Sequence, residues 1–177
     1  MKLQQQDYPF EIAPLANHHN RAAFSCGVEP LDRYLQKQAS QDVAKHVAAV
    51  FVATPDAQTI AGFYTLSAHA LSPGELPPEV AKKLPRYPSV PVTLLGRLAV
   101  SVAFQGQRLG EILLLDALKR ALVHSREVAS AAVVVDAKDE RVRTFYLRHD
   151  FIPLPAQPNR LFFLMKSVEK LFDKTGG

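Results

Sequence analysis

The sequence predicts an α/β domain in which helices flank a central mixed β-sheet. Three observations support this prediction: β-rich and helix-periodic segments alternate along the chain, short apolar runs fit buried strands, and residues 94–123 have the pattern of a strand, a glycine-bearing turn and a helix. Such alternation is typical of domains whose helices cover a sheet. A chain of 177 residues is expected to form one domain, residues 1–177, that buries about 70% of its unfolded surface.

The N-terminal half is expected to supply a strand, a helix and a hairpin. A strand is predicted over Tyr8–Leu15, and Pro30 suits the first turn of a helix that continues to about His46. Val47–Ala53 and Thr59–His69 are rich in strand-forming residues, and the Pro and Asp between them are typical of a turn. We therefore expect these two runs to pair as a hairpin.

A long connection with six prolines, Ala70–Pro91, separates the two halves of the chain. Connections of this length within a domain are usually functional or disordered, and a short helix is expected over Glu79–Leu84. The elements predicted after it are a strand at Leu94–Val100, a helix from Leu109, a strand at Ala131–Val135, a helix at Asp136–His149, and a β pair at Phe151–Pro153 and Leu161–Lys166.

The turn between the strand Leu94–Val100 and the next helix is the main functional signal. Leucine and isoleucine recur at helical spacing from Leu109 onward, so the helix starts directly after the polar, glycine-bearing segment Gln105–Gly110. The unpaired amides and the dipole of a helix's first turn attract anions such as a pyrophosphate. The Lys–Ser/Thr of a Walker loop and the third glycine of a dinucleotide fingerprint are missing, which excludes both of those motifs.

Composition is that of an ordinary protein of a reducing compartment. The apolar fraction is 47%, the charged fraction is 21%, and the single Cys26 cannot form an intramolecular disulfide. The first ten residues lack the apolar core of a signal peptide and the apolar runs are shorter than a membrane span, so a cytoplasmic protein without a membrane partner is expected. The net charge of +4 is compatible with a polyanionic partner without requiring one.

The histidines and the cysteine give no signal for metal or nucleophilic chemistry. None of the six histidines forms an HExxH motif or an i,i+4 pair, so no metal site is predicted. Cys26 has no neighbouring base in the sequence and is expected to fill space in the core. His69, at the end of a predicted strand, is the one histidine singled out as a candidate accessory base.

The glycine-bearing turn resembles the pyrophosphate loop of the GNAT superfamily of N-acetyltransferases. The pattern there is Gln or Arg, two residues, Gly, one residue, then Gly or Ala, and only Arg108 departs from it, in place of the first motif glycine. A Cβ at that position restricts the approach of a phosphate, whereas the Arg108 guanidinium suits phosphate oxygens. The loop residues that the resemblance implies for cofactor binding are Gln105, Gly106, Gln107, Arg108, Leu109 and Gly110.

A wider set of short motifs resembles the acetyltransferase toxins of bacterial toxin–antitoxin pairs. The motifs are FSCG at 24–27, LDRYL at 31–35, FYTLS at 63–67, LPRYP at 84–88, GRLAV at 96–100, KDE at 138–140 and FY at 145–146. The resemblance implies the GNAT acyl-CoA N-acyltransferase fold, acetyl-CoA as co-substrate, the α-amine of aminoacyl-tRNA as acceptor and a ribbon-helix-helix antitoxin as partner. It leaves open whether the enzyme forms a homodimer.

Tyr146 has two interpretations. Its place at the edge of the apolar face of a helix predicts a half-buried packing residue. The resemblance implies instead a general acid that protonates the departing CoA thiolate, and a phenol of pKa about 10 is protonated at neutral pH. The other cofactor contacts that the resemblance implies are Leu98, Ala99 and Val100 along the pantetheine and thioester, and Phe145.

Four basic residues are candidates for contacts with tRNA phosphates: Lys82, Lys83, Arg86 and Arg97. Arg97 fits an outward-facing surface charge equally well, and Arg86 with Tyr87 fits a solvated loop. The α-amine of an aminoacyl ester has a pKa no higher than roughly 7.7–8.0, so no strong catalytic base is required. Direct transfer in a ternary complex is therefore expected.

Three classes of function are left open by the sequence. The first is an acetyl-CoA-dependent toxin that acetylates aminoacyl-tRNA and inhibits translation. The second is an acetyltransferase for a small amine or a protein lysine, and the third is a binding protein on the same fold whose catalysis has lapsed. The sequence does not indicate which aminoacyl group is preferred.

Overall fold

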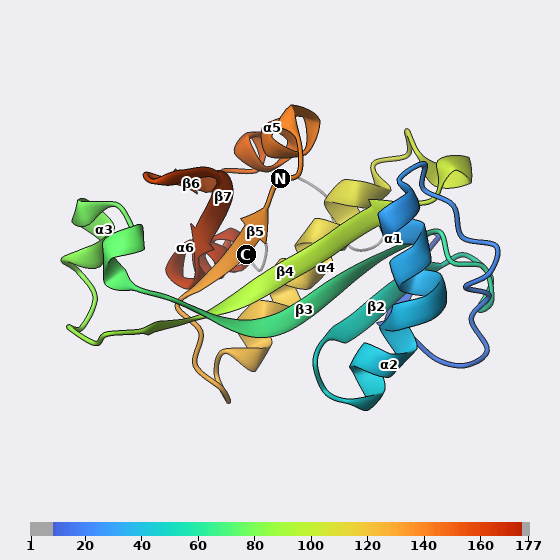
Figure 1. The fold of residues 1–177 in the computed structure, drawn as a ribbon, viewed down its shortest axis with the longest axis horizontal. Helices are drawn as coiled ribbons and strands as arrows, with labels where there is room; N and C mark the ends of the chain where they lie inside the picture. The colour runs from blue at the N-terminus through green and yellow to red at the C-terminus, as the bar shows by residue number, and fades with distance from the viewer. Residues whose placement is uncertain (1–8, 175–177) are drawn as a thin grey trace. The chain divides into compact units, whose positions relative to one another are not determined.

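The computed structural model describes residues 9–174, which contain a seven-stranded mixed sheet of order β1-β2-β3-β4-β5-β7-β6 (Figure 1). The strands are β1 Glu11–Pro14, β2 Ala49–Thr54, β3 Gly62–Leu71, β4 Val90–Val100, β5 Ala132–Asp136, β6 Ile152–Leu154 and β7 Gln157–Leu164. The pairs β1–β2, β2–β3, β5–β7 and β6–β7 are antiparallel, whereas β4 and β5 run parallel. The predicted α/β class with a mixed sheet is confirmed.

Helices connect most of the strands. They are α1 Glu29–Arg33, the π-helix η1 Tyr34–Gln38, α2 Ala39–Ala44, the 3-10 turn η2 Pro73–Glu75, α3 Pro78–Ala81, the 3-10 turn η3 Val102–Phe104, α4 Leu109–His124, α5 Glu140–Arg148 and α6 Met165–Asp173. The parallel strands β4 and β5 require a crossover, which α4 provides. Among the described residues, no helix is long and apolar enough to cross a membrane.

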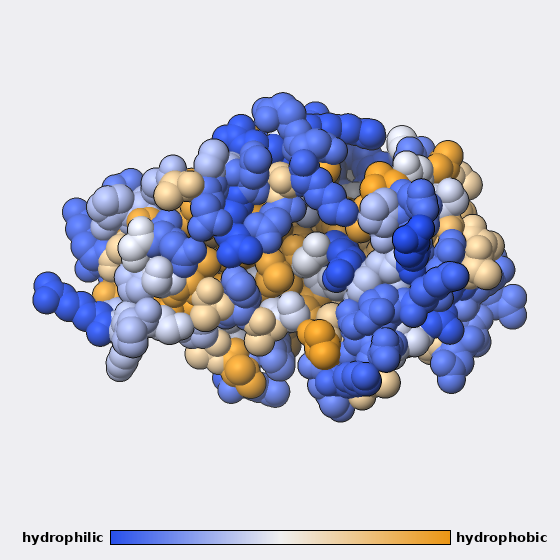
Figure 2. Space-filling view, viewed as in Figure 1, coloured by the Kyte–Doolittle hydropathy of each residue, from blue (hydrophilic) through white to orange (hydrophobic). Residues whose placement is uncertain are grey.

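The chain divides into two compact units, each with its own core. The first unit comprises the residues up to Ser67 together with Gly96–Ala117, and the second comprises Ala68–Leu95 together with the residues from Leu118 onward. The face of the molecule in Figure 2 is mainly hydrophilic, with hydrophobic side chains in small scattered patches.

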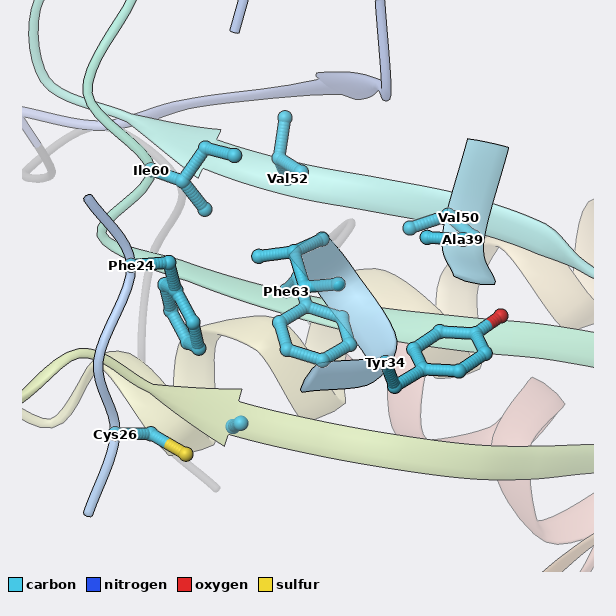
Figure 3. Close-up of a cluster of buried hydrophobic side chains, with 10 residues drawn as sticks. Phe24, Cys26, Tyr34, Ala39, Val50, Val52, Ile60 and Phe63 are labelled. Carbon is cyan, nitrogen blue, oxygen red and sulfur yellow. The ribbon is translucent and has the colours of Figure 1, made fainter. Parts of the chain in front are cut away.

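The core of the first unit is centred on Phe63 of β3 (Figure 3). Phe24 meets the Phe63 ring edge-on at a centroid distance of 5.3 Å, and Tyr34 of η1 stacks on it at 6.2 Å. Val52 of β2 and Leu35 of η1 are fully buried in the same cluster. This core fixes the helical segment α1–η1–α2 to the strands of the first unit.

The second unit buries one face of β5 and β7 against the proline-rich connection. Its apolar cluster joins Val134 and Phe162 to Leu71 and to Leu76, which follows η2. A separate row of aromatic rings links α5 to β7, because Phe151 lies 5.2 Å from Tyr146 and 5.3 Å from Phe163. These contacts hold α5, and therefore Tyr146, in one place within this unit.

Two predictions for the N-terminal half need correction. The strand predicted at Tyr8–Leu15 is β1 Glu11–Pro14, and Tyr8 lies outside the described residues. The helix predicted from Pro30 to His46 is divided by the π-helix η1 and ends at Ala44. Within this segment, the Tyr34 hydroxyl of η1 donates a hydrogen bond to Asp42 of α2.

The C-terminal predictions were wrong at several boundaries. The strand predicted at Leu161–Lys166 is β7, which starts earlier and ends at Leu164, while Met165 begins the unpredicted helix α6. The helix predicted at Asp136–His149 begins only at Glu140, because Asp136 completes β5 and Asp139 caps the helix. The strand predicted at Leu94–Val100 already begins at Val90.

Candidate active site

The loop predicted to bind an anion lies in the first unit, directly before α4. The first α-helical hydrogen bond of α4 runs from the Ile112 amide to the Arg108 carbonyl over 3.2 Å, so the amides of residues 109–111 lie outside the helical ladder. Leu109 and Leu113 are buried and fix the start of the helix in the core. The geometry therefore provides backbone donors and the positive end of a long helix at one place.

The turn requires two left-handed residues, and only one of them is glycine. Gly106 has φ +82°, and Arg108 has φ +62°. Arg108 thus adopts the backbone conformation that the missing motif glycine favours, which costs a non-glycine residue about 1–2 kcal/mol. The backbone at position 108 is therefore left-handed although the residue there is arginine and not glycine.

Gln105 anchors this loop to two other segments. Its side-chain amide donates to the carbonyl of Cys26 at 3.1 Å and to the carbonyl of Val100 at 3.0 Å. Nearby, the Ser101 hydroxyl donates to the carbonyl of Ser25, which also holds the 24–27 turn against the end of β4. Gln105 therefore positions the loop, a role that the pattern of the motif alone does not reveal.

The end of β4 approaches β3 very closely. A Cβ added to Gly62 would lie 2.9 Å from the carbonyl oxygen of Ala99 and 2.8 Å from a methyl group of Leu113. Ala99 is buried, while Leu98 and Val100 are partly exposed and leave one face of the strand accessible within the unit. The predicted cofactor residues of β4 and of the loop are therefore brought together in the first unit.

Arg97 does not behave as an isolated surface charge. Its guanidinium carbon lies 3.5 Å from the centroid of the Tyr34 ring, and the Tyr34 hydroxyl donates to Asp42 at 2.9 Å. Gln38 donates to the other oxygen of Asp42 at 2.9 Å. Burial, with this hydrogen bond, raises the pKa of Tyr34 to about 12. The spacing of Tyr34, Gln38 and Asp42 at i, i+4 and i+8 was visible in the sequence and could have indicated this cluster.

Tyr146 lies in the second unit, on α5. Asp139 caps this helix by accepting the Val142 amide at 2.9 Å, and the Tyr146 ring packs on Phe145 and Phe151 at 5.2 Å each. Only 5% of Tyr146 is exposed, so it is more deeply buried than the predicted half-buried residue. Burial raises the pKa of Tyr146, which keeps the phenol protonated at neutral pH.

His69 is engaged by a neighbouring cation in the second unit. A guanidinium nitrogen of Arg160 lies 3.2 Å from Nε2 of His69, and Arg160 also makes a bidentate pair with Asp136 at 2.7 and 2.9 Å. A guanidinium can only donate, so Nε2 of His69 is the acceptor in this contact. Nε2 is therefore not available as a base. Within residues 9–174, no three potential metal ligands gather.

The four basic candidates belong to two different units. Lys82, Lys83 and Arg86 are exposed on the segment between α3 and β4 of the second unit, beside Tyr87, which is 67% exposed. Arg97 belongs to the first unit. Lys82, Lys83 and Arg86 therefore form one basic group, and Arg97 is considered as a second.

Comparison with known proteins identifies the family. No family model matches the chain. A probable toxin TacT of Sinorhizobium fredii is 30% identical over 169 residues, which cover 90% of this chain and 93% of that protein. The chain belongs to the family of GNAT toxins. The tRNA-acetylating toxin of Mycobacterium tuberculosis is 35% identical to this GNAT toxin over 149 residues, 84% of this chain and 88% of that protein.

Solved structures confirm the GNAT fold. AtaT complexed with acetyl-methionyl-tRNAfMet matches with a TM-score of 0.86 and 30% identity, over 92% of this chain and 99% of that one. AtaTR bound with acetyl-CoA matches with a TM-score of 0.80 and 30% identity, over 92% and 98%. A tyrosine-to-phenylalanine mutant of KacT matches with a TM-score of 0.86 and 30% identity, over 92% and 99%.

Proposed function

We propose that this GNAT toxin transfers the acetyl group of acetyl-CoA to the α-amine of an amino acid esterified to tRNA and so blocks translation. The observation that supports this most directly is the similarity, over nearly the whole chain, to AtaT in complex with acetyl-methionyl-tRNA. The strand, left-handed turn and helix start of the first unit supply the anion-binding geometry that a CoA diphosphate requires. We also propose that residues 1–177 form one acetyltransferase domain, which acts in the cytoplasm.

Acetyl-CoA is expected to bind along β4 and the loop. Backbone groups of Leu98, Ala99 and Val100 would orient the pantetheine and the thioester carbonyl, with Phe145 as a further contact. The amides of residues 107–110 would bind the diphosphate, while Gln105 keeps the loop in place through its two carbonyl contacts. No metal is needed for either task.

Tyr146 is proposed to protonate the leaving group. The neutral α-amine attacks the thioester carbonyl, the carbon–sulfur bond breaks, and the CoA sulfur takes the phenolic proton. The new amide nitrogen releases one proton, which restores the phenol, so protons balance over the cycle. A phenol of ordinary pKa about 10 already holds its proton at neutral pH, as a donor must, and burial, which raises the pKa of Tyr146, leaves it protonated before reaction. AtaT and KacT have also been studied as tyrosine-to-phenylalanine mutants.

Contacts with tRNA are proposed for both basic groups. Arg97 is held flat on Tyr34, so its N–H groups keep a fixed direction and less side-chain entropy is lost when they bind a phosphate. Lys82, Lys83 and Arg86 are exposed and supply positive charge without a fixed geometry. The net charge of +4 favours the approach of RNA.

An antitoxin is the expected protein partner. AtaT has been solved bound to the C-terminus of the antitoxin AtaR, and KacTA has been solved with DNA. We propose that this protein is likewise neutralised by an antitoxin, of the ribbon-helix-helix type. A homodimer is compatible with this proposal and is tested by the mass of the purified protein in solution.

The decisive experiment is acetyl transfer to charged tRNA. We expect charged tRNA to be acetylated at its α-amine, while uncharged tRNA, free amino acids and lysine peptides are not, and we expect the rate to fall between low and high salt. Equal acetylation of lysine peptides without salt dependence would indicate an acetyltransferase for protein lysines or small amines. An absence of acetyl-CoA binding at millimolar concentration would indicate a binding protein whose catalysis has lapsed.

A further inference from the structure

Arg108 is the residue by which this chain departs from the loop pattern, and its side chain is already occupied. Nε of Arg108 lies 3.0 Å from Oε2 of Glu111, and one terminal nitrogen lies 2.8 Å from the same oxygen. The Arg108 side chain is 64% exposed and the Glu111 side chain is 25% exposed. Two donors of the guanidinium are therefore directed at one carboxylate rather than into solvent.

Glu111 also occupies the positive end of α4. It lies in the first turn of this 16-residue helix, where a negative side chain is stabilised by the helix dipole. A diphosphate bound at the loop would use the same dipole and the same guanidinium. Glu111 and the diphosphate therefore compete for both partners, and they also repel one another.

We infer that Glu111 determines the affinity of this loop for acyl-CoA, by neutralising Arg108 until a diphosphate takes its place. This inference rests on the proposed function, which assigns the CoA diphosphate to the loop. Arg108 stands where the loop pattern has glycine, and it makes its ion pair with Glu111 from a left-handed backbone at φ +62°. An enzyme with glycine at this position has no guanidinium for Glu111 to neutralise.

The test is calorimetric titration of Glu111→Gln with acetyl-CoA at low and at high salt. Glutamine keeps the size and helix propensity of the side chain and removes only its charge. We expect the dissociation constant to fall roughly three- to tenfold at low ionic strength, because one like charge beside the diphosphate is removed, and we expect the gain to shrink in about 0.5 M salt. Glu127→Gln, at an exposed position beyond the end of α4, makes the same change in net charge and should leave affinity unchanged.

Two further sets of titrations identify the part of acetyl-CoA and the side chain on which Glu111 acts. The gain should persist with 3′-dephospho-acetyl-CoA, which retains the diphosphate, and should be absent with S-acetyl-pantetheine, which lacks it. Arg108→Ala should weaken acetyl-CoA binding more in the Glu111→Gln background than in the wild type, because only there is the guanidinium released.

The outcomes separate the inference from the function on which it rests. Wild-type binding with an unchanged or weaker Glu111→Gln variant overturns the inference and leaves the proposed function intact. A gain that is equal for S-acetyl-pantetheine also overturns it. A wild-type protein that binds no acetyl-CoA overturns the proposed function itself.

Discussion

The guanidinium carbon of Arg97 lies 3.5 Å from the centroid of the Tyr34 ring, and this stack joins β4 to the π-helix η1. The Tyr34 hydroxyl is in turn held by Asp42 of α2. One face of the guanidinium thus lies against the ring, and hydrogen bonds from Gln38 and Tyr34 together with the charge of Arg97 lower the pKa of Asp42. Such an arrangement presents a cation in a fixed direction. The contributions of the Tyr34 ring and of the Tyr34 hydroxyl can be tested separately.

The first prediction distinguishes the ring of Tyr34 from its hydroxyl. Tyr34→Phe keeps the cation–π contact and loses the bond to Asp42, so we expect kcat/KM for charged tRNA to change less than about threefold. Tyr34→Leu removes the contact and should lower kcat/KM roughly three- to thirtyfold, since a cation–π pair contributes about 0.5–2 kcal/mol. The measurement is acetyl transfer to charged tRNA over a range of salt concentrations.

Acetyl-CoA affinity and the unfolding midpoint serve as controls for the Tyr34 variants. The affinity for acetyl-CoA should be similar in the two variants if the effect is limited to tRNA, whereas the unfolding midpoint should be lower for Tyr34→Leu, because the Tyr34 ring stacks on Phe63 in the core. Arg97→Ala should reproduce the loss in Tyr34→Leu and flatten the salt dependence by about one phosphate contact. Full activity of Arg97→Ala would show that this stack only supports the fold.

The second prediction concerns backbone strain at Arg108. Arg108→Gly relieves the left-handed conformation at φ +62°, whereas Arg108→Ala keeps the strain and removes the same side chain. We therefore expect the glycine variant to be more stable than the alanine variant by about 1 kcal/mol in urea unfolding. Equal stabilities would mean that this backbone conformation is not strained in the folded protein.

The third prediction tests the close approach of β3 and β4. Gly62→Ala should lower the free energy of unfolding by about 1–3 kcal/mol, because the new methyl group would press on the backbone carbonyl of Ala99 and on Leu113. Gly74→Ala is a matched control, since no atom lies within 4 Å of a Cβ at that position, and it should change stability by less than about 0.5 kcal/mol. Similar losses in both variants would contradict this explanation.

The sequence was sufficient for the fold and for the order of strand, turn and helix around residues 105–110, because both depend on local patterns. Alternating apolar periodicity gave the order of strands and helices, and the glycine-bearing turn before Leu109 marked the helix start. The helix α6 was missed because Leu161–Met165 forms an uninterrupted apolar run, in which strand and helix cannot be told apart by periodicity. The helical spacing of Val168, Leu171 and Phe172 after it was the overlooked signal.

The details of the candidate site depend on contacts between segments distant in sequence. No local pattern shows that the Gln105 amide reaches the carbonyl of Cys26, or that Arg160 occupies Nε2 of His69. The π turn of η1, in which Tyr34 stacks on Phe63 and donates to Asp42, was likewise not predicted. Residue types and spacing therefore predicted candidate residues, but not the contacts that these residues make with distant segments.

The fourth prediction concerns the thiol of Cys26. Burial raises its pKa to about 11, so the folded protein keeps the thiol protonated where an unfolded chain has begun to release the proton, near pH 9. The unfolded state therefore binds fewer protons above pH 9, and stability should fall as pH rises from about 9 to 11. Cys26→Ala should remove this component of the pH dependence. An identical slope in both proteins over that range would contradict the raised pKa.

The last prediction tests Tyr146 as a proton donor. Tyr146→Phe keeps the ring contacts with Phe145 and Phe151 and removes the phenolic proton, so the unfolding midpoint and the affinity for acetyl-CoA should be nearly unchanged. Turnover with charged tRNA should fall roughly 10²–10⁴-fold, the usual size of a general-acid contribution. The defect should shrink with an acetyl thioester of a more acidic thiol, because such a leaving group needs less protonation. A purely structural role for the hydroxyl would instead lower stability and leave the defect the same for every donor, and normal turnover would assign the proton to water or to another side chain.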